Sequence, residues 1–93
     1  MKFEWDEEKN NINIKKHNVS FHEAQTIFED NNIQFYEDTE HSDIEERFIA
    51  IGRSYKRNIL FICYCIRLEN TIRLISARIA NKKEREVYNA KHN

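Results

Sequence analysis

Residues 47–79, RFIAIGRSYKRNILFICYCIRLENTIRLISARI, combine apolar segments of strand length with arginines that recur along them. Two short polar stretches, residues 55–58 and 68–70, separate segments of residues 46–54, 59–67 and 71–79. Segments rich in isoleucine, phenylalanine and tyrosine with such short connections are typical of antiparallel strands. We therefore expect a three-stranded meander whose central strand is nearly all apolar and covered on both faces.

The arginines of this stretch raise the question of function: Arg47, Arg53, Arg57, Arg67, Arg73 and Arg78. With residues 68–70 as the turn, Arg67 lies opposite Thr71. Two residues back, Cys65 lies opposite Arg73. Because side chains alternate between the faces of a strand, Arg73 is expected near Arg67, and Arg78 at the far end on the opposite face. Arginine at a strand end can simply reach water, whereas on an open face its planar donors suit phosphate. Both interpretations are open.

The composition limits the class of protein. The chain has 93 residues, 40% hydrophobic and 33% charged, with one glycine and no proline, which predicts a single domain over residues 1–93. No apolar run approaches the about 18 residues of a membrane helix, and the N-terminus lacks the apolar segment of a secretory signal. We expect a cytoplasmic protein without a cofactor. Cys63 and Cys65 are expected to be buried thiols in a reducing compartment, without a disulfide and without a metal.

The net charge of −1 hides an uneven distribution. Residues 1–46 contain four lysines, no arginine and thirteen acidic residues, whereas residues 47–93 contain eleven basic and three acidic residues. Such polarity indicates either a basic face for an anionic partner, or an acidic half that neutralises the basic half within one domain.

The N-terminal region predicts a short strand and a helix. Residues 3–5 alternate like a strand, and Asp6 is a suitable N-cap for a helix that runs to about residue 16. Its apolar face is thin, with Ile12 and Ile14 to one side, so we expect it to depend on packing. Asn18 can take the left-handed conformation that ends a helix.

Two further helices have clear start signals. Ser20 and Glu23 form a capping box, and a helical apolar stripe follows: Phe21, Ala24, Ile27 and Phe28. Residues 33–36 predict a strand before an acidic loop that contains His41. Asn81 with Glu84 begins a last helix. The order of one strand, two helices, four strands and one helix predicts an α+β fold.

Candidate residues for proton transfer and RNA contact are few. His17, which follows Lys16 at a helix end, suits proton transfer, although a surface histidine is the commoner reason for such a position. His22 and His92 are expected to be inert. Glu46 beside Arg47 is either a base or part of an ion pair.

Tyr88, with Arg85 one turn earlier, is either a stacking residue for RNA or core packing with a solvated tip. A chain with a single glycine excludes the phosphate-binding loop and the dinucleotide fingerprint.

Short segments spread along the whole chain resemble one protein family in order and spacing. They are Phe3-Glu4-Trp5-Asp6 with Lys9; Lys16-His17-Asn18-Val19-Ser20-Phe21 with Glu23-Ala24; Phe28-Glu29-Asp30; His41-Ser42 with Glu45-Glu46-Arg47; Ile51-Gly52 with Ser54; and Ile72-Arg73-Leu74-Ile75-Ser76-Ala77-Arg78 with Ala80, Glu84, Arg85 and Tyr88. The chain resembles the BrnT family of bacterial toxins, small RelE-like ribonucleases of type II toxin–antitoxin systems.

The resemblance implies a compact RelE-like domain, in which a curved antiparallel sheet packs with two N-terminal helices and a C-terminal helix. It implies metal-independent RNA cleavage by attack of the ribose 2′-hydroxyl on its own phosphate, which inhibits translation and growth. It also implies a cognate, BrnA-like antitoxin that neutralises the toxin and binds operator DNA, and a possible dimer within the complex. Family members usually carry glycine near Arg57, so a differently built turn is expected here.

The resemblance also suggests residue roles. Arg67 and Arg78 would hold and neutralise phosphate, assisted by Arg47 or Arg73. His17, helped by Lys16, or Glu46 would move protons. Tyr88 would position RNA, with Arg85 as a further contact. The alternatives are a binding module of the same fold that does not cleave RNA, and an interaction protein whose arginines are merely solvated.

Overall fold

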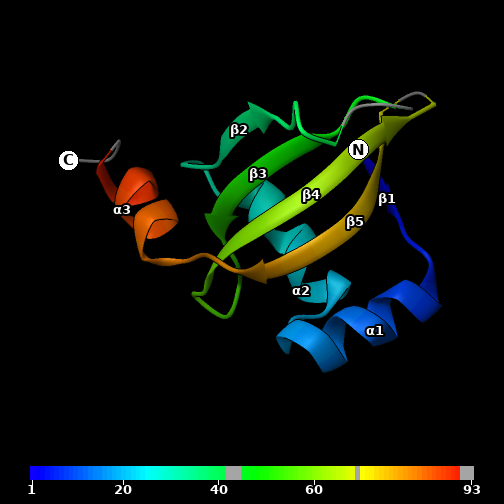
Figure 1. Cartoon of the computed structure of the whole chain (residues 1–93), viewed down its shortest axis with the longest axis horizontal. Coiled ribbons are helices and arrows are strands. Elements are labelled where there is room, and N and C mark those ends of the chain that lie inside the picture. Colours follow the sequence, from blue (N-terminus) through cyan, green and yellow to red (C-terminus); the bar gives the residue numbers. More distant parts are fainter. Residues whose placement is uncertain (42–44, 69, 91–93) are drawn as a thin grey trace.

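The computed structural model describes residues 1–41, 45–68 and 70–90. Its elements are β1 (Lys2–Glu4), α1 (Glu7–His17), α2 (Phe21–Gln25), the 3-10 helix η1 (Thr26–Glu29), β2 (Gln34–Glu37), β3 (Phe48–Arg53), β4 (Ile59–Arg67), β5 (Thr71–Ile79) and α3 (Lys82–Ala90). The strands form one sheet in the order β1-β5-β4-β3-β2 (Figure 1). This architecture confirms the α+β class. The sheet is mixed, because β1 joins β5 in parallel while the other neighbours are antiparallel.

The meander has the predicted strands, and β4 is its central strand. The turn between β4 and β5 gives the predicted pairs, Arg67 with Thr71 and Cys65 with Arg73; Glu69 of this turn lies outside the described residues. In the turn between β3 and β4, Arg57 has φ 73°, in the left-handed region that favours glycine. Arg57 itself therefore takes the conformation that glycine favours, and this turn is built without a glycine.

A β-bulge at Ile75 changes the register of β5. Tyr64 pairs with Leu74, but Cys63 pairs with Ser76, so one residue of β5 is left over. An extra residue reverses which face the following side chains occupy. Arg78 consequently pairs with Phe61 and faces the same way as Arg73. The prediction that Arg78 lies on the opposite face is therefore wrong.

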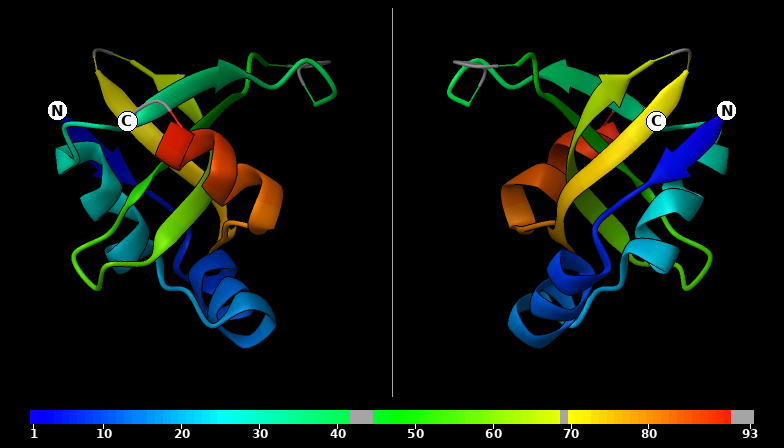
Figure 2. Two further views of the ribbon diagram at one scale, coloured as in Figure 1. Left: turned by 90° about the vertical axis from the view of Figure 1, so that its left-hand side faces the viewer. Right: turned by 90° about the vertical axis from the view of Figure 1, so that its right-hand side faces the viewer.

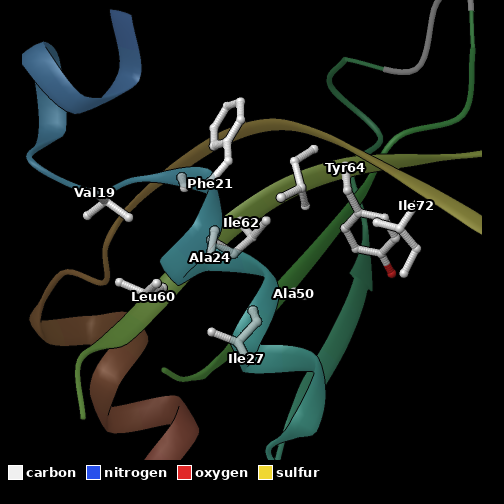
Figure 3. Packing of buried hydrophobic residues seen from close by; sticks show 11 residues of the cluster. Val19, Phe21, Ala24, Ile27, Ala50, Leu60, Ile62, Tyr64 and Ile72 are labelled. Atoms are coloured by element: carbon white, nitrogen blue, oxygen red, sulfur yellow. The ribbon is translucent and has the colours of Figure 1, made fainter. Parts of the chain in front are cut away.

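Helices cover both faces of the sheet. Helices α1 and α2 lie on one side and α3 on the other (Figure 2). Under α2 lies the main core, which Figure 3 shows: Val19, Phe21, Ala24, Ile27, Ala50, Leu60, Ile62, Tyr64, Ile72, Leu74 and Ala77. A smaller cluster under α3 contains Ile51, Ile59, Ala80 and Tyr88. The predicted apolar stripe of the second helix is confirmed, although its second half is a 3-10 turn. Within the described residues, no helix is long and apolar enough to cross a membrane.

Helix α1 is held by buried amides. Ile12 and Ile14 are 56% and 38% exposed, whereas Asn10 and Asn13 are buried, so the side chains that pack this helix against the domain include polar ones. The Asn13 amide donates to the carbonyls of Val19 and Ala77, each at 2.8 Å, and accepts from Ala77 N at 3.1 Å. Buried backbone groups need such partners, which explains why a polar residue fastens this helix to the edge of β5.

The capping signals are largely confirmed. Asn81 and Glu84 exchange hydrogen bonds of 2.8 and 2.9 Å between side chains and backbone at the start of α3. Ser20 Oγ accepts from Glu23 N at 3.0 Å. The Glu23 carboxylate, however, accepts from Ser54 and Asn58 at 2.6 and 3.0 Å. It therefore ties α2 to the β3–β4 turn instead of closing the capping box.

Replacing Asn13 by alanine should destabilise the fold strongly. The change leaves three buried backbone groups without their partner, and an unsatisfied buried group costs about 1–3 kcal/mol. We expect Asn13→Ala to lower the free energy of unfolding in urea by about 2–3 kcal/mol. Asn11→Ala on the exposed side of the same helix is the matched control and should change it by no more than about 0.5 kcal/mol. Equal effects of the two substitutions would contradict the anchoring role.

Candidate functional site

Four arginines share the sheet face opposite α1 and α2, and we call this surface the arginine face: Arg47, Arg67, Arg73 and Arg78. The alternate residues Phe61, Cys63 and Cys65 of β4 form its floor, because the intervening residues point into the main core. Arg73 and Arg78 stand opposite Cys65 and Phe61. Helix α3 covers one end of this face (Figure 2).

Arg78 is held in a fixed orientation. Its two terminal nitrogens donate to the two carboxylate oxygens of Glu84 at 2.8 and 2.9 Å, and its guanidinium carbon lies 4.1 Å from the ring centroid of Phe61. The hydrogen bonds to Glu84 raise the pKa of Arg78 and lower the pKa of Glu84, so both groups stay charged at neutral pH. A planar guanidinium fixed in this way presents its remaining donors in one direction.

Arg67 and Arg73 lie together at the other end of the arginine face. They line a hollow of about 430 Å³ with Glu4, Leu68 and Thr71. Arg67 lies 3.4 Å from a Glu45 oxygen, and Arg73 donates to Glu4 at 2.8 Å. These ion pairs join the acidic half of the chain to its basic half. Because they are partly exposed, each is worth about 0–1 kcal/mol, and an incoming phosphate can compete with the carboxylates.

The cysteines of the floor are neutral thiols. Burial, followed by the negative charge of Asp38, raises the pKa of Cys63 to about 11. Burial, followed by the charge of Glu45, also raises the pKa of Cys65. Both thiols are buried and free of disulfides, as predicted. Because thiolates are the reactive and metal-binding form, these cysteines serve as packing. Within the part of the chain that the structure describes, no three His, Cys, Asp or Glu residues are grouped to hold a metal.

A second hollow, of about 400 Å³, lies beside Arg78. Its lining residues come from four strands and from the segment after β2: Glu37, Asp38, Thr39, Glu40, His41, Ile49, Phe61 and Arg78. His41 Nδ1 lies 3.1 Å from both carboxylate oxygens of Asp38. The sequence interpretation gave His41 no role. The available signal was the spacing of a histidine three residues after an aspartate, whereas the burial of this aspartate follows from the fold.

Two of the other candidates lie away from the arginine face. Lys16 and His17 are at the end of α1, which covers the opposite side of the sheet (Figure 2). Glu46 is exposed two residues before β3 begins. The structure therefore brings the four arginines together but does not bring His17 to them. His22 stacks edge-on against Trp5, with ring centroids 4.8 Å apart, and His92 lies outside the described residues.

Tyr88 and Arg85 have structural contacts in α3. Tyr88 is 3% exposed, and its hydroxyl donates to Asp30 at 2.5 Å. Burial and the Asp30 contact raise the pKa of Tyr88. Arg85 donates to the Ala80 carbonyl at 2.6 Å. These contacts fasten α3 to the segment after η1 and to the residue after β5, and α3 in turn carries Glu84 beside Arg78.

Comparison with known proteins identifies the family. A family model described as the ribonuclease toxin BrnT of type II toxin–antitoxin systems matches residues 5–84. The 1.1 Å crystal structure of the Brucella abortus ribonuclease toxin BrnT superimposes with a TM-score of 0.68 at 25% sequence identity, covering 88% of this chain and 99% of the Brucella chain. A search of curated proteins gives no match. Because the family model spans most of the sequence, the chain belongs to the BrnT family of type II toxin–antitoxin ribonuclease toxins.

Proposed function

We propose that this protein cleaves RNA on the arginine face without a metal ion, by attack of a ribose 2′-hydroxyl on the adjacent phosphate. The observation that carries the proposal is the bulge at Ile75, which turns Arg78 onto the face that already bears Arg67 and Arg73. Membership of a ribonuclease toxin family supports RNA as the substrate. Cleavage of messenger RNA would then inhibit translation and growth.

The reaction needs proton transfer and stabilisation of negative charge. A base takes the proton of the 2′-hydroxyl, the 2′-oxygen forms a bond to phosphorus, and the bond from phosphorus to the 5′-oxygen breaks. The products are a 2′,3′-cyclic phosphate and a 5′-hydroxyl, which receives a proton from an acid or from water. The pentavalent intermediate carries more negative charge than the substrate, so fixed cations beside it lower the barrier.

The geometry supports a division of labour among the arginines. Arg78, held by Glu84 over the ring of Phe61, suits the phosphate that reacts. Arg73, with Arg67 beside it, suits another phosphate of the same RNA, because its strand partner Cys65 lies four residues along β4 from Phe61, or about 13 Å at 3.3 Å per residue. Arg47, beside Cys63, would add positive charge between these two points.

The remaining candidates take different roles. Glu46 precedes Arg47 and stays a candidate base near the face, whereas His17 and Lys16 would contact RNA only if it wrapped around the domain. Tyr88 and Arg85 would act indirectly, by fixing α3 and with it the Glu84 carboxylate.

The partner proposed for this toxin is a cognate antitoxin. Family membership supports an antitoxin of a type II system. We propose that it neutralises the toxin by binding the protein, that it carries the DNA-binding part, and that the toxin contacts operator DNA only through it. A toxin dimer within that complex and a cytoplasmic location belong to the same proposal.

A binding module that does not cleave RNA is the second candidate. The observation that favours it is the pairing of three face arginines with glutamates: Arg67 with Glu45, Arg73 with Glu4 and Arg78 with Glu84. Such pairs would leave a surface that binds RNA weakly or recognises a protein. The two candidates differ in whether RNA bound by the purified protein is cut.

Arg78→Ala should abolish most RNA cleavage in the presence of EDTA. Loss of one fixed charge-stabilising group typically costs about 10²–10³-fold in rate. We would measure cleavage of a defined messenger RNA by the purified chain, with and without ribosomes, and map the new ends. Wild type should cut in EDTA and leave a 5′-hydroxyl.

Arg57→Gly is the matched control for this experiment. It removes the same charge from an exposed turn away from the arginine face, and the φ of 73° at this position suits glycine. Its rate should stay close to that of wild type. Full activity of Arg78→Ala, or loss of wild-type cleavage in EDTA, would contradict the proposal, and RNA that is bound but uncut would favour the second candidate.

RNA affinity should fall steeply with salt. Neutralisation of phosphates releases counterions, so the logarithm of the association constant falls with the logarithm of the salt concentration, by about 0.7 per phosphate contact on single strands. Arg73→Ala should reduce this slope by about 0.7, whereas Arg57→Gly should leave it unchanged. Fluorescence anisotropy across a salt series measures both slopes, and a slope near zero for wild type would indicate solvated arginines.

A further inference from the structure

The hollow beside Arg78 contains a histidine–aspartate pair that the roles above leave unused. His41 and Asp38 line this hollow of about 400 Å³ together with Arg78 and Phe61. We propose that His41 is a catalytic residue that takes the proton from the 2′-hydroxyl, and that Asp38 positions it. This inference rests on the proposed RNA cleavage and assigns its base.

Asp38 is a firm support for the imidazole. Its side chain is only 10% exposed. Its backbone N donates to the Arg47 carbonyl at 2.9 Å, which continues the pairing of β2 with β3 beyond Glu37. The thiol of Cys63 on β4 lies 3.7 Å from its Oδ2. Asp38 is therefore fixed at the floor of the arginine face, by its backbone to the residue before β3 and by its carboxylate to β4.

The contact between His41 and Asp38 determines which ring nitrogen is available. Nδ1 lies 3.1 Å from both oxygens of the carboxylate. Because a carboxylate can only accept, Nδ1 carries the hydrogen and donates a hydrogen bond to Asp38. In the neutral ring Nε2 is then the acceptor. The side chain of His41 is 62% exposed, which leaves this nitrogen accessible to a ligand. An aspartate that fixes the tautomer and orientation of a histidine base is the arrangement of the serine-hydrolase triad.

The base and the phosphate-binding cation border the same hollow. Arg78 comes from β5 and His41 from the segment after β2, so the fold brings together residues 37 positions apart in sequence. A phosphate at Arg78 would place its ribose in the hollow. Nε2 takes the 2′-hydroxyl proton, the 2′-oxygen bonds to phosphorus, and the leaving 5′-oxygen takes a proton from water.

The surroundings of His41 favour this role over simple phosphate binding. The charged and titratable groups that face this hollow or its floor are Glu37, Asp38, Glu40, Arg47, Cys63 and Arg78. The carboxylates stabilise the imidazolium that forms when the base takes its proton, whereas they would repel a phosphate bound directly at His41. The reacting phosphate therefore belongs at Arg78, with the histidine beside the ribose.

The test is the effect of His41→Ala on cleavage by the purified full chain, with RNA binding measured separately. Loss of a general base costs about 10²–10⁴-fold in rate, and we expect this loss with little change in RNA affinity. A general base acts only in its unprotonated form, so the wild-type rate should fall as the pH is lowered, and this acid limb should disappear in the variant. Added imidazole should partly restore cleavage by His41→Ala.

Two further variants separate chemistry from folding. His22→Ala, at an exposed histidine stacked on Trp5 on the other side of the sheet, is the matched control and should cleave like wild type. Asp38→Asn should slow cleavage by about tenfold or more, since it disturbs the tautomer of the base, and imidazole should not rescue it. A folded His41→Ala that cleaves RNA at the wild-type rate with an unchanged pH profile would overturn the role of His41 while leaving the proposed function intact. Wild-type protein that cuts no RNA would overturn both.

Discussion

The extra residue at Ile75 is the constraint on which the arrangement of the arginines depends. Because side chains in a strand alternate with a period of two, one additional residue exchanges the faces of everything that follows it. Without it, Arg78 would enter the main core and Ala77 would turn toward Phe61. With it, Ala77 is buried in the core and Arg78 lies over Phe61. The same bulge thus places a small apolar side chain in the core on one face and a charged side chain on the other face.

The contact by which Asn13 fastens α1 to β5 lies immediately after this bulge. Asn13 bonds to both backbone groups of Ala77, two residues beyond Ile75 and one before Arg78. A side-chain amide in this position occupies donor and acceptor groups at the edge of β5, where β1 has already ended. It therefore holds the strand in its shifted register. The helix on one side of the sheet consequently contributes to the position of an arginine on the other side.

Much of the fold could be predicted from local patterns, whereas the site depended on features without a local signal. The meander, the Arg67–Thr71 register and the Asn81–Glu84 cap follow from periodicity and turn residues, which act over a few positions. The bulge depends on how β5 packs against α1 and β4, and the buried Asn13 depends on backbone groups 64 residues away. For this reason the predicted register separated the arginines that the structure brings together. His41 was overlooked because the aspartate that orients it becomes buried only when β2 joins the sheet.

The orientation of Arg78 depends in turn on how α3 is held. Glu84 accepts two hydrogen bonds from Arg78. Helix α3 itself is held by hydrogen bonds from the Tyr88 hydroxyl to Asp30, which follows η1, and from Gln34 of β2 to the Tyr88 carbonyl. A third hydrogen bond runs from Arg85 to the carbonyl of Ala80. Changes at these contacts would loosen α3 and release Arg78 together. A loss of activity from such changes would consequently reflect geometry and not direct contact with RNA. Under the proposed function, a buried residue such as Tyr88 would affect cleavage through the position of Arg78, and the reacting groups would be the exposed residues that border the hollow at Arg78.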